Sequence, residues 1–235
     1  MKLKGLLVIG ISAFLVFLIY LSNIDSKIYY LTLGDYSVTT KQNGYTNIIR
    51  QNLADKGKLE TYVTEFNTDK ARITDLINDI NQNKKVVINH EEKTIKNALI
   101  KADFVIVSVG SNDLFYELET KPTLTEALYD KVDQILADGM TLYQLLRKYC
   151  KEDIFVTGFY NPYEKEYDEL IEYANTKLKK QLADQDITYI NVQGCVANDS
   201  PRIQFQLTEE NNQCVANKIK NQMRAKLFEE VVASQ

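Results

Sequence analysis

The fold of this chain is decided by the stretch Val105-Ile106-Val107-Ser108-Val109-Gly110-Ser111-Asn112-Asp113-Leu114. Apolar and β-branched residues open the stretch and give way abruptly to Gly-Ser-Asn-Asp. This pattern predicts a buried strand with a polar cluster at its carboxyl end. Residues 28–33 repeat the pattern and run into Gly34-Asp35-Tyr36-Ser37. Sites in open α/β sheets form outside the carboxyl ends of strands, so the two segments together predict a functional site.

Strand and helix patterns alternate along the chain after residue 25. Strands are predicted at residues 28–33, 59–66, 104–109, 154–159 and 188–192, with a short strand-like element at 86–88. Helices are predicted at residues 44–56, 73–82, 92–102, 125–149, 164–185 and 211–232. Because helical crossovers join parallel strands, the sequence predicts an α/β fold, a flavodoxin-like three-layer α/β/α sandwich with a five-stranded parallel sheet. No repeat or linker-like composition interrupts residues 26–235, which we expect to form one domain.

The first 25 residues differ from the rest. Residues 1–4 form a short basic segment. The polar residues of the following segment, residues 5–21, are only Ser12 and Tyr20. That length is at the lower limit for a transmembrane helix, and no small-residue cleavage pattern follows it. We therefore expect residues 1–25 to form an N-terminal transmembrane anchor, with a cleaved signal peptide as the alternative. The basic N-terminus favours a single-pass protein with its N-terminus in the cytoplasm and its globular domain outside the cell.

The overall composition excludes several classes of protein. Charged residues make up 26% and hydrophobic residues 45% of the chain, as in ordinary globular proteins. A formal net charge of −4 without a long basic run argues against a nucleic-acid partner. The chain has one histidine, and its carboxylates lack metal-ligand spacing, so we expect no metal site. It also has neither G-x-G-x-x-G nor a P-loop, and no cofactor is expected.

Two of the three cysteines lie on either side of the segment before the last predicted helix. A disulfide between Cys195 and Cys214 would close a loop of about 20 residues and contribute about 3 kcal/mol of stability. Two unpaired thiols are the alternative. Cys150 ends an amphipathic helix pattern and is expected to be a small core residue.

The two strand ends together resemble the SGNH (GDSL-type) esterase and acylhydrolase family. Gly34-Asp35 followed by Gly44-Tyr45 is similar to the family's first block, and Gly110-Ser111-Asn112-Asp113 is an intact third block. The segment Gly158-Phe159-Tyr160-Asn161-Pro162 resembles the membrane-anchored branch found in Gram-positive bacteria. The resemblance covers roughly residues 28–230. It implies that Asn112 donates a hydrogen bond to an oxyanion, while Asn112 and Asp113 as simple turn caps are the alternative.

The chain departs from the family pattern at two positions near the strand ends. Tyr36 stands where the family has its nucleophilic serine. A phenol, whose reference pKa is about 10, is a poor acyl acceptor at neutral pH. Ser37 comes one residue late, so its side chain should point the other way unless a bulge intervenes. Lys70 stands where the family has an oxyanion-hole glycine, and its backbone N–H serves only if that position does not require a positive φ.

The departures continue before the last helix. Aligned on Asn212, Glu210 replaces the family's histidine base and Leu207 replaces its aspartate. The single histidine, His90, precedes the helix predicted at 92–102, whose start should lie on the same side of the sheet as the strand ends. His90 as a substitute base is therefore one hypothesis, and a surface or capping residue is the other.

Three functions follow from these residues. The first is a degenerate SGNH-type protein that has lost hydrolysis and binds or scaffolds an acylated or glycan component of the cell envelope. Its pocket would be shaped by Tyr36, Asn112 and Glu210. The residues expected to bind the ligand are Gly34, Asp35, Lys70, Gly110 and Asp113. The second is an ester hydrolase with rearranged chemistry, in which Ser37 or Tyr36 attacks, Glu210 or His90 acts as base and Asn112 stabilises the oxyanion. The third is an unrelated flavodoxin-like binder.

Overall fold

The computed structural model describes residues 27–35, 43–88, 90–120, 125–161, 163, 165–196 and 207–233. Within these ranges, five parallel strands form one sheet in the order β2-β1-β5-β6-β7. The strands are β1 (Ile28–Gly34), β2 (Leu59–Val63), β5 (Phe104–Ser108), β6 (Asp153–Thr157) and β7 (Thr188–Ile190). The α/β fold and the five-stranded parallel sheet predicted from the sequence are thus confirmed.

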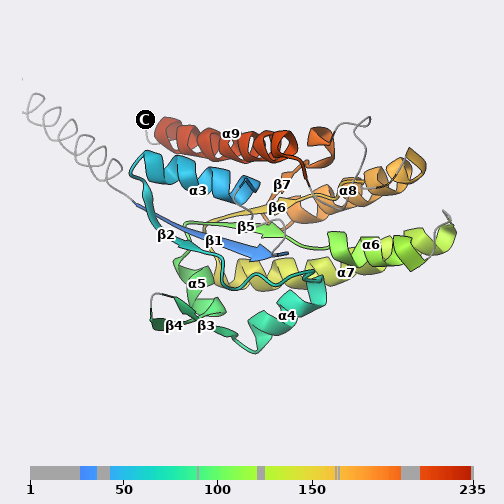
Figure 1. The fold of residues 1–235 in the computed structure, drawn as a ribbon, viewed down its shortest axis with the longest axis horizontal. Coiled ribbons are helices and arrows are strands. Elements are labelled where there is room, and N and C mark those ends of the chain that lie inside the picture. The colour runs from blue at the N-terminus through green and yellow to red at the C-terminus, as the bar shows by residue number, and fades with distance from the viewer. Residues whose placement is uncertain are drawn as a thin grey trace, which may run out of the picture.

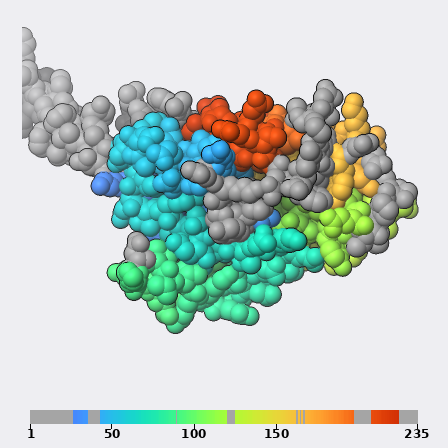
Figure 2. All heavy atoms as spheres, in the orientation of Figure 1, coloured from blue at the N-terminus to red at the C-terminus, as the bar shows by residue number. Residues whose placement is uncertain are grey.

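The helices in the described part of the chain are α3 (Tyr45–Asp55), α4 (Ile73–Asn81), α5 (Ile95–Lys101), α6 (Ser111–Thr120), α7 (Glu126–Tyr149), α8 (Asp168–Ala183) and α9 (Glu209–Ala233). Two short 3₁₀ turns, η1 (Lys165–Tyr167) and η2 (Gln193–Cys195), and a hairpin of β3 (Lys85–Ile88) and β4 (Glu91–Thr94) complete the set. Helices α3 and α9 pack together on one face of the sheet, while α7 lies on the other face and contacts α4, α5 and α8 (Figure 1). The adjacent surfaces of α3 and α9 are visible in Figure 2.

The sheet is the centre of the core. Val105, Ile106 and Val107 of β5 are fully buried, as expected for a strand covered on both faces. An aromatic row crosses the sheet, because the Phe104 ring lies 4.4 Å from that of Tyr30 and 6.1 Å from that of Phe155. Burying each such side chain contributes about 1.5–3 kcal/mol, so the central strands hold the strand ends firmly.

The β3–β4 hairpin corrects one predicted helix. Residues 91–94 pair with residues 85–88 in antiparallel register instead of starting a helix at residue 92. Helix α5 begins only after Thr94, whose side chain accepts a hydrogen bond of 3.3 Å from the Asn97 N–H and so caps the helix. In Figure 1 the hairpin lies at the opposite end of the sheet from the arrowheads of β1 and β5. The expectation that this region approaches the strand ends was therefore wrong.

The segment before α9 is fixed by a disulfide between Cys195 and Cys214, whose Cα atoms are 5.6 Å apart. The Asn211 side chain adds a 2.6 Å hydrogen bond to the carbonyl of Cys195. Cys150 is a free thiol buried at the end of α7. The anchor predicted at residues 1–25 lies outside the described residues. Over the ranges that are described, no helix combines the length and apolar character needed to cross a membrane.

Candidate functional site

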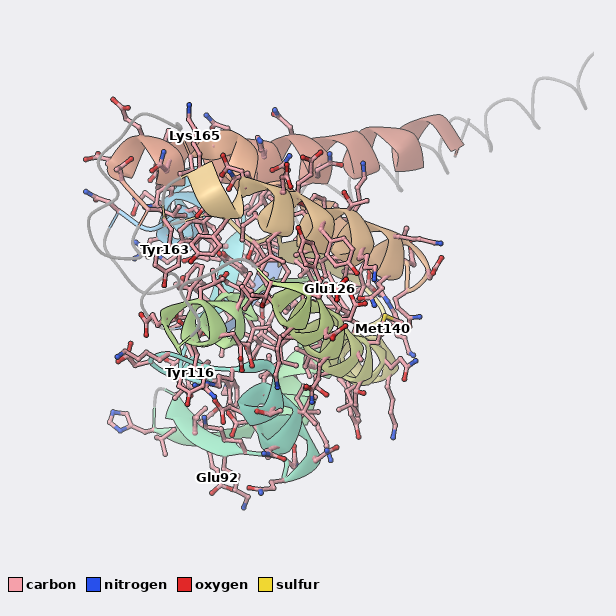
Figure 3. The ribbon with its side chains drawn as sticks, turned by 90° about the vertical axis from the view of Figure 1, so that its right-hand side faces the viewer. Glu92, Tyr116, Glu126, Met140, Tyr163 and Lys165 are labelled. Atoms are coloured by element: carbon pink, nitrogen blue, oxygen red, sulfur yellow. A yellow bond between two sulfur atoms is a disulfide. The ribbon has the colours of Figure 1, made fainter. Side chains whose placement is uncertain are left out.

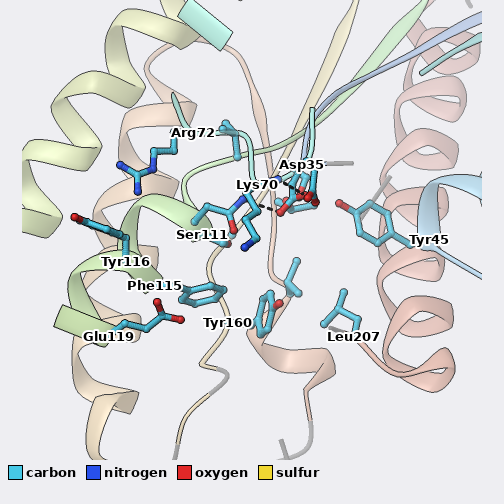
Figure 4. A pocket seen from close by; sticks show the side chains of 17 residues that line it. Asp35, Tyr45, Lys70, Arg72, Ser111, Phe115, Tyr116, Glu119, Tyr160 and Leu207 are labelled. Carbon is cyan, nitrogen blue, oxygen red and sulfur yellow. Dashed lines mark hydrogen bonds between the residues drawn. The ribbon is translucent and has the colours of Figure 1, made fainter. Parts of the chain in front are cut away.

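A pocket of about 500 Å³ opens at the carboxyl ends of β1, β5 and β6. Its polar floor comes from the ends of these strands and from the first residue of α3, and its wall comes from α6. Asp35, Tyr45, Ser108, Asn112 and Thr157 line it (Figure 4). The two strand ends that the sequence singled out therefore do meet at one site.

Gly34 allows the first strand end to approach the second. It has a φ of +123°, and a Cβ atom there would lie 2.0 Å from the carbonyl oxygen of Ser108. That carbonyl accepts a 2.9 Å hydrogen bond from the Asp35 N–H. Only glycine fits this close contact between the ends of β1 and β5. Gly34 therefore shapes the site through its backbone and is not among the residues that line the pocket.

The Asp35 carboxylate joins the blocks of the site. One oxygen accepts a 2.7 Å hydrogen bond from the Asn112 amide, and the other accepts a 3.3 Å bond from the Lys70 N–H. The Asn112 amide also donates to the carbonyl of Ala71 at 3.1 Å. An amide nitrogen carries two hydrogens, so both donors of Asn112 are used within the protein. In this arrangement neither donor is left for an oxyanion.

Lys70 keeps the turn of the oxyanion-hole block without a glycine. Its φ is +54°, a left-handed conformation that favours glycine over residues with a Cβ. Its N–H points at Asp35 rather than at the open pocket. Its ammonium side chain instead extends into the pocket (Figure 4). The Lys70 side chain thus brings a positive charge to the pocket.

Gly110 and Asp113 support the site from behind. Gly110 has a φ of +99°, and a Cβ there would lie 3.2 Å from the ring of Phe159. The Asp113 carboxylate accepts a 3.2 Å hydrogen bond from the Ile73 N–H at the start of α4. Burial raises the pKa of Asp113 to about 6, against the opposing effect of that hydrogen bond. Neither residue is among those that line the pocket, and both hold the backbone beside it.

Leu207, Glu210 and Asn212, near the start of α9, lie in three different environments. Leu207, which the sequence comparison aligned with the family's aspartate, lines the pocket. Glu210 is exposed in the first turn of α9 and is not among the residues that line the pocket. Asn212 is buried; it accepts a 3.1 Å hydrogen bond from the Tyr45 N–H and donates to the carbonyls of Leu207 and Thr208. The aligned asparagine therefore ties α9 to α3.

Of the three residues considered as nucleophile or substitute base, only His90 lies in the described part of the chain. Tyr36 and Ser37 lie outside the described residues. His90 is exposed in the turn of the β3–β4 hairpin with a φ of +66°, far from the strand ends. Figure 3 shows the hairpin residue Glu92 at the lower edge of the molecule, beyond α4. The hypothesis of a catalytic His90 is therefore wrong, because residues 91–94 form a strand and carry the turn away from the site.

Sequence reasoning missed the aromatic wall of the pocket. Phe115 and Tyr160 line it with ring centres 5.6 Å apart, and Tyr116 lies at its mouth, half exposed. The Arg72 guanidinium lies 4.5 Å from the centre of the Tyr116 ring, a cation–π contact (Figure 4). The missed signal was the spacing of Leu114, Phe115 and Leu118, one apolar helical face that identifies α6.

The described side chains were compared with the arrangement that a metal site requires. They contain no group of three or more His, Cys, Asp or Glu residues placed to hold a metal ion.

The sequence model of the GDSL-like lipase/acylhydrolase family matches residues 25–219. This chain belongs to that family. The match spans the strand ends, the pocket and the start of α9, so the family assignment covers the whole site. No curated protein matches the chain.

Solved structures agree with this assignment at the level of the fold. A lipase from a goat rumen metagenome has a TM-score of 0.66 at 15% identity, covering 82% of this chain and 95% of its own. An acetylxylan esterase from Geobacillus stearothermophilus has a TM-score of 0.57 at 14% identity, covering 83% and 94%. A further acetyl xylan esterase has a TM-score of 0.58 at 16% identity, covering 82% and 98%. At these identities the likeness shows the SGNH hydrolase fold.

Proposed function

We propose that this protein is a catalytically degenerate member of the GDSL-like family that binds a cell-envelope ligand in its pocket instead of hydrolysing it. The single observation that carries the proposal concerns the base. The chain has one histidine, and that residue lies exposed in the β3–β4 turn, outside the pocket. The described residues that line the pocket therefore include no imidazole, the side chain best suited to taking the proton from a serine at neutral pH.

The rest of the site supports the same conclusion. Leu207 offers no carboxylate to orient a base, and Glu210 faces solvent. The Asn112 amide is already engaged by Asp35 and by the carbonyl of Ala71. In active enzymes, losing one oxyanion donor costs about 10²–10³ in rate. A missing base and an occupied donor together predict an activity far below that of a functional esterase.

The proposal includes a place in the cell. We propose that residues 1–25 anchor the protein in the membrane and that the domain from residue 26 lies outside the cell. This rests on the basic N-terminus and the apolar segment that follows it. The ligand would then be an acylated or glycan component of the envelope. Two of the solved structures with this fold are esterases named for acetylated xylan, which makes acylated saccharides the first class of ligand to screen.

A fluorophosphonate serine-hydrolase probe tests the loss of activity. The full chain, its Ser37→Ala variant and an active esterase of the same family are treated in parallel, and adducts are mapped by peptide mass spectrometry. We expect labelling of the active enzyme and none of this chain. A stoichiometric adduct on Ser37 that disappears in Ser37→Ala would instead establish the alternative, an ester hydrolase with rearranged residues.

A further inference from the structure

The floor of the pocket contains a buried hydroxyl group that the protein itself leaves unsatisfied. Tyr45 is 1% exposed and lines the pocket, and its hydroxyl makes no hydrogen bond of normal geometry. Leaving such a group buried without a partner costs about 1–3 kcal/mol. In the close-up, the hydroxyl is directed at the end of the pocket where Asp35 lies (Figure 4). A buried donor aimed at a cavity is the arrangement expected of a ligand-binding group.

The neighbours of this hydroxyl define what it can bind. The hydroxyls of Ser108 and Thr157 are near enough to lower the pKa of Tyr45, although neither closes a bond of normal geometry with it. Burial outweighs them and raises that pKa to about 12, so the phenol keeps its proton at every physiological pH. The Asp35 carboxylate also acts on Tyr45 through its charge. The floor thus combines one phenol donor, two alcohols and one carboxylate acceptor.

This combination favours an alcohol over a carbonyl group. A ligand oxygen between Tyr45 and Asp35 must accept a hydrogen bond from the phenol. It must also carry a hydrogen, because two oxygens that have only lone pairs facing each other repel. A ligand hydroxyl does both, because it can accept from Tyr45 and donate toward Asp35 or toward Thr157. An ester carbonyl has no hydrogen to donate and would meet the carboxylate unfavourably.

The walls of the pocket suit the apolar faces of a sugar ring. Phe115 and Tyr160 are almost fully buried and present their aromatic rings beside the hydroxyl-rich floor. Tyr116 adds a third ring at the mouth. A volume of about 500 Å³ falls in the usual range for small-ligand sites.

We propose that the Tyr45 hydroxyl is a ligand-binding group that hydrogen-bonds an alcohol hydroxyl of a saccharide held in this pocket. The inference rests on the proposed function, because it names the ligand class and one contact of the same site. It assigns to Tyr45, at the first position of α3, a role beyond starting the helix.

The test uses the full chain, purified in a detergent without a sugar headgroup and labelled with 3-fluorotyrosine. The ¹⁹F resonance absent from Tyr45→Phe identifies Tyr45. Titrations use cellobiose, D-xylose and N-acetyl-D-glucosamine, with methyl butyrate as an ester that has acceptor oxygens only. Tyr116→Phe is the matched control, since it removes a hydroxyl from another tyrosine of the same pocket and retains the ring under Arg72.

We expect at least one saccharide to shift the Tyr45 resonance, and Tyr45→Phe to weaken that saccharide's binding by about tenfold, with little change in Tyr116→Phe. The unliganded Tyr45→Phe protein should melt no lower than the wild type, because the removed oxygen has no partner. A clear loss of thermal stability would show that the hydroxyl serves the fold and would overturn the inference. Equal saccharide affinity in wild type and Tyr45→Phe, or binding of none of the three sugars, would also overturn it.

Failure of the proposed function would look different. Release of acid from methyl butyrate, or from acetylated cellobiose added as a separate assay, would end the proposal of a degenerate enzyme. The ¹⁹F shift and the Tyr45→Phe affinity would still decide whether Tyr45 binds a sugar hydroxyl.

Discussion

The two sides of the pocket compare differently with the family pattern. The strand-end side contains Gly34, Asp35 and the intact block from Gly110 to Asp113, and all of them occupy structured positions around the pocket. The pre-helix side, residues 207–212, was aligned with the pattern through Asn212. That alignment predicts Leu207 and Glu210 at the positions of the triad acid and base. Residues that hold the backbone are found mainly on the strand-end side. The positions predicted for the acid and the base of a triad lie on the pre-helix side.

The matching residues share contacts that the fold needs. Gly34 admits the carbonyl of Ser108, Asp113 holds the start of α4, and Asn212 connects the start of α9 with that of α3. By contrast, the Glu210 side chain is exposed on the first turn of α9. The side chains that hold the pocket's backbone are therefore different from those at which we propose that the chemistry was lost.

The largest effect should come from Gly34→Ala on the strand-end side. The added Cβ would lie 2.0 Å from the backbone oxygen of Ser108, at the end of the central strand β5, and the φ of +123° disfavours it further. We expect a loss of about 4 kcal/mol or failure to fold, measured by urea unfolding. Gly57→Ala is the control, because it has a φ of +66° and no atom within 4 Å of its Cβ. It should cost about 1 kcal/mol, and equal losses would contradict the argument from close contact.

The disulfide should be the strongest single support of the pre-helix side. Replacing Cys195 and Cys214 by serine releases a loop spanning 19 positions, which should lower the free energy of unfolding by about 3 kcal/mol. Thermal unfolding with and without a reductant measures the effect. The double variant should be insensitive to the reductant, whereas a wild type that is equally insensitive would show that the bridge contributes little.

Asn212→Ala and Glu210→Gln compare the stability contributions of a buried and an exposed residue of the same segment. The change removes three hydrogen bonds at a buried position and should cost about 2 kcal/mol in chemical unfolding. Glu210→Gln, two residues away and exposed, should stay within about 0.5 kcal/mol of the wild type. A large loss in Glu210→Gln would mean that the two kinds of residue are not separable here.

The smallest effect should be a pH dependence on the strand-end side. Asp113 has a pKa of about 6 in the folded protein and a lower one in the unfolded chain, so the folded state binds this proton more tightly. Its contribution to the free energy of unfolding is therefore present at pH 4 and lost as the pH rises through about 6. Asp113→Asn should remove that decline and be more stable than the wild type by about 1 kcal/mol at pH 7. If the free energy of unfolding depended on pH in the same way in both proteins, the raised pKa of Asp113 would be refuted.

The sequence by itself determined the sheet and the place of the site. The β-branched run at residues 105–107 required a strand buried on both faces, and Gly34 and Gly110 marked where the strands end. These features follow from local periodicity and backbone freedom, so neighbouring residues suffice to predict them. The same local patterns misplaced the start of α5, because residues 91–94 form β4 only through pairing with β3.

Only the tertiary structure decided what the pocket can do. The engagement of both Asn112 donors depends on Asp35 and Ala71, which lie 77 and 41 positions away in the chain. The unsatisfied hydroxyl of Tyr45 and the outward position of Glu210 likewise depend on how α3 and α9 pack. Hydrogen-bond satisfaction and burial are properties of contacts between distant segments, and the order of residues in one segment does not contain them.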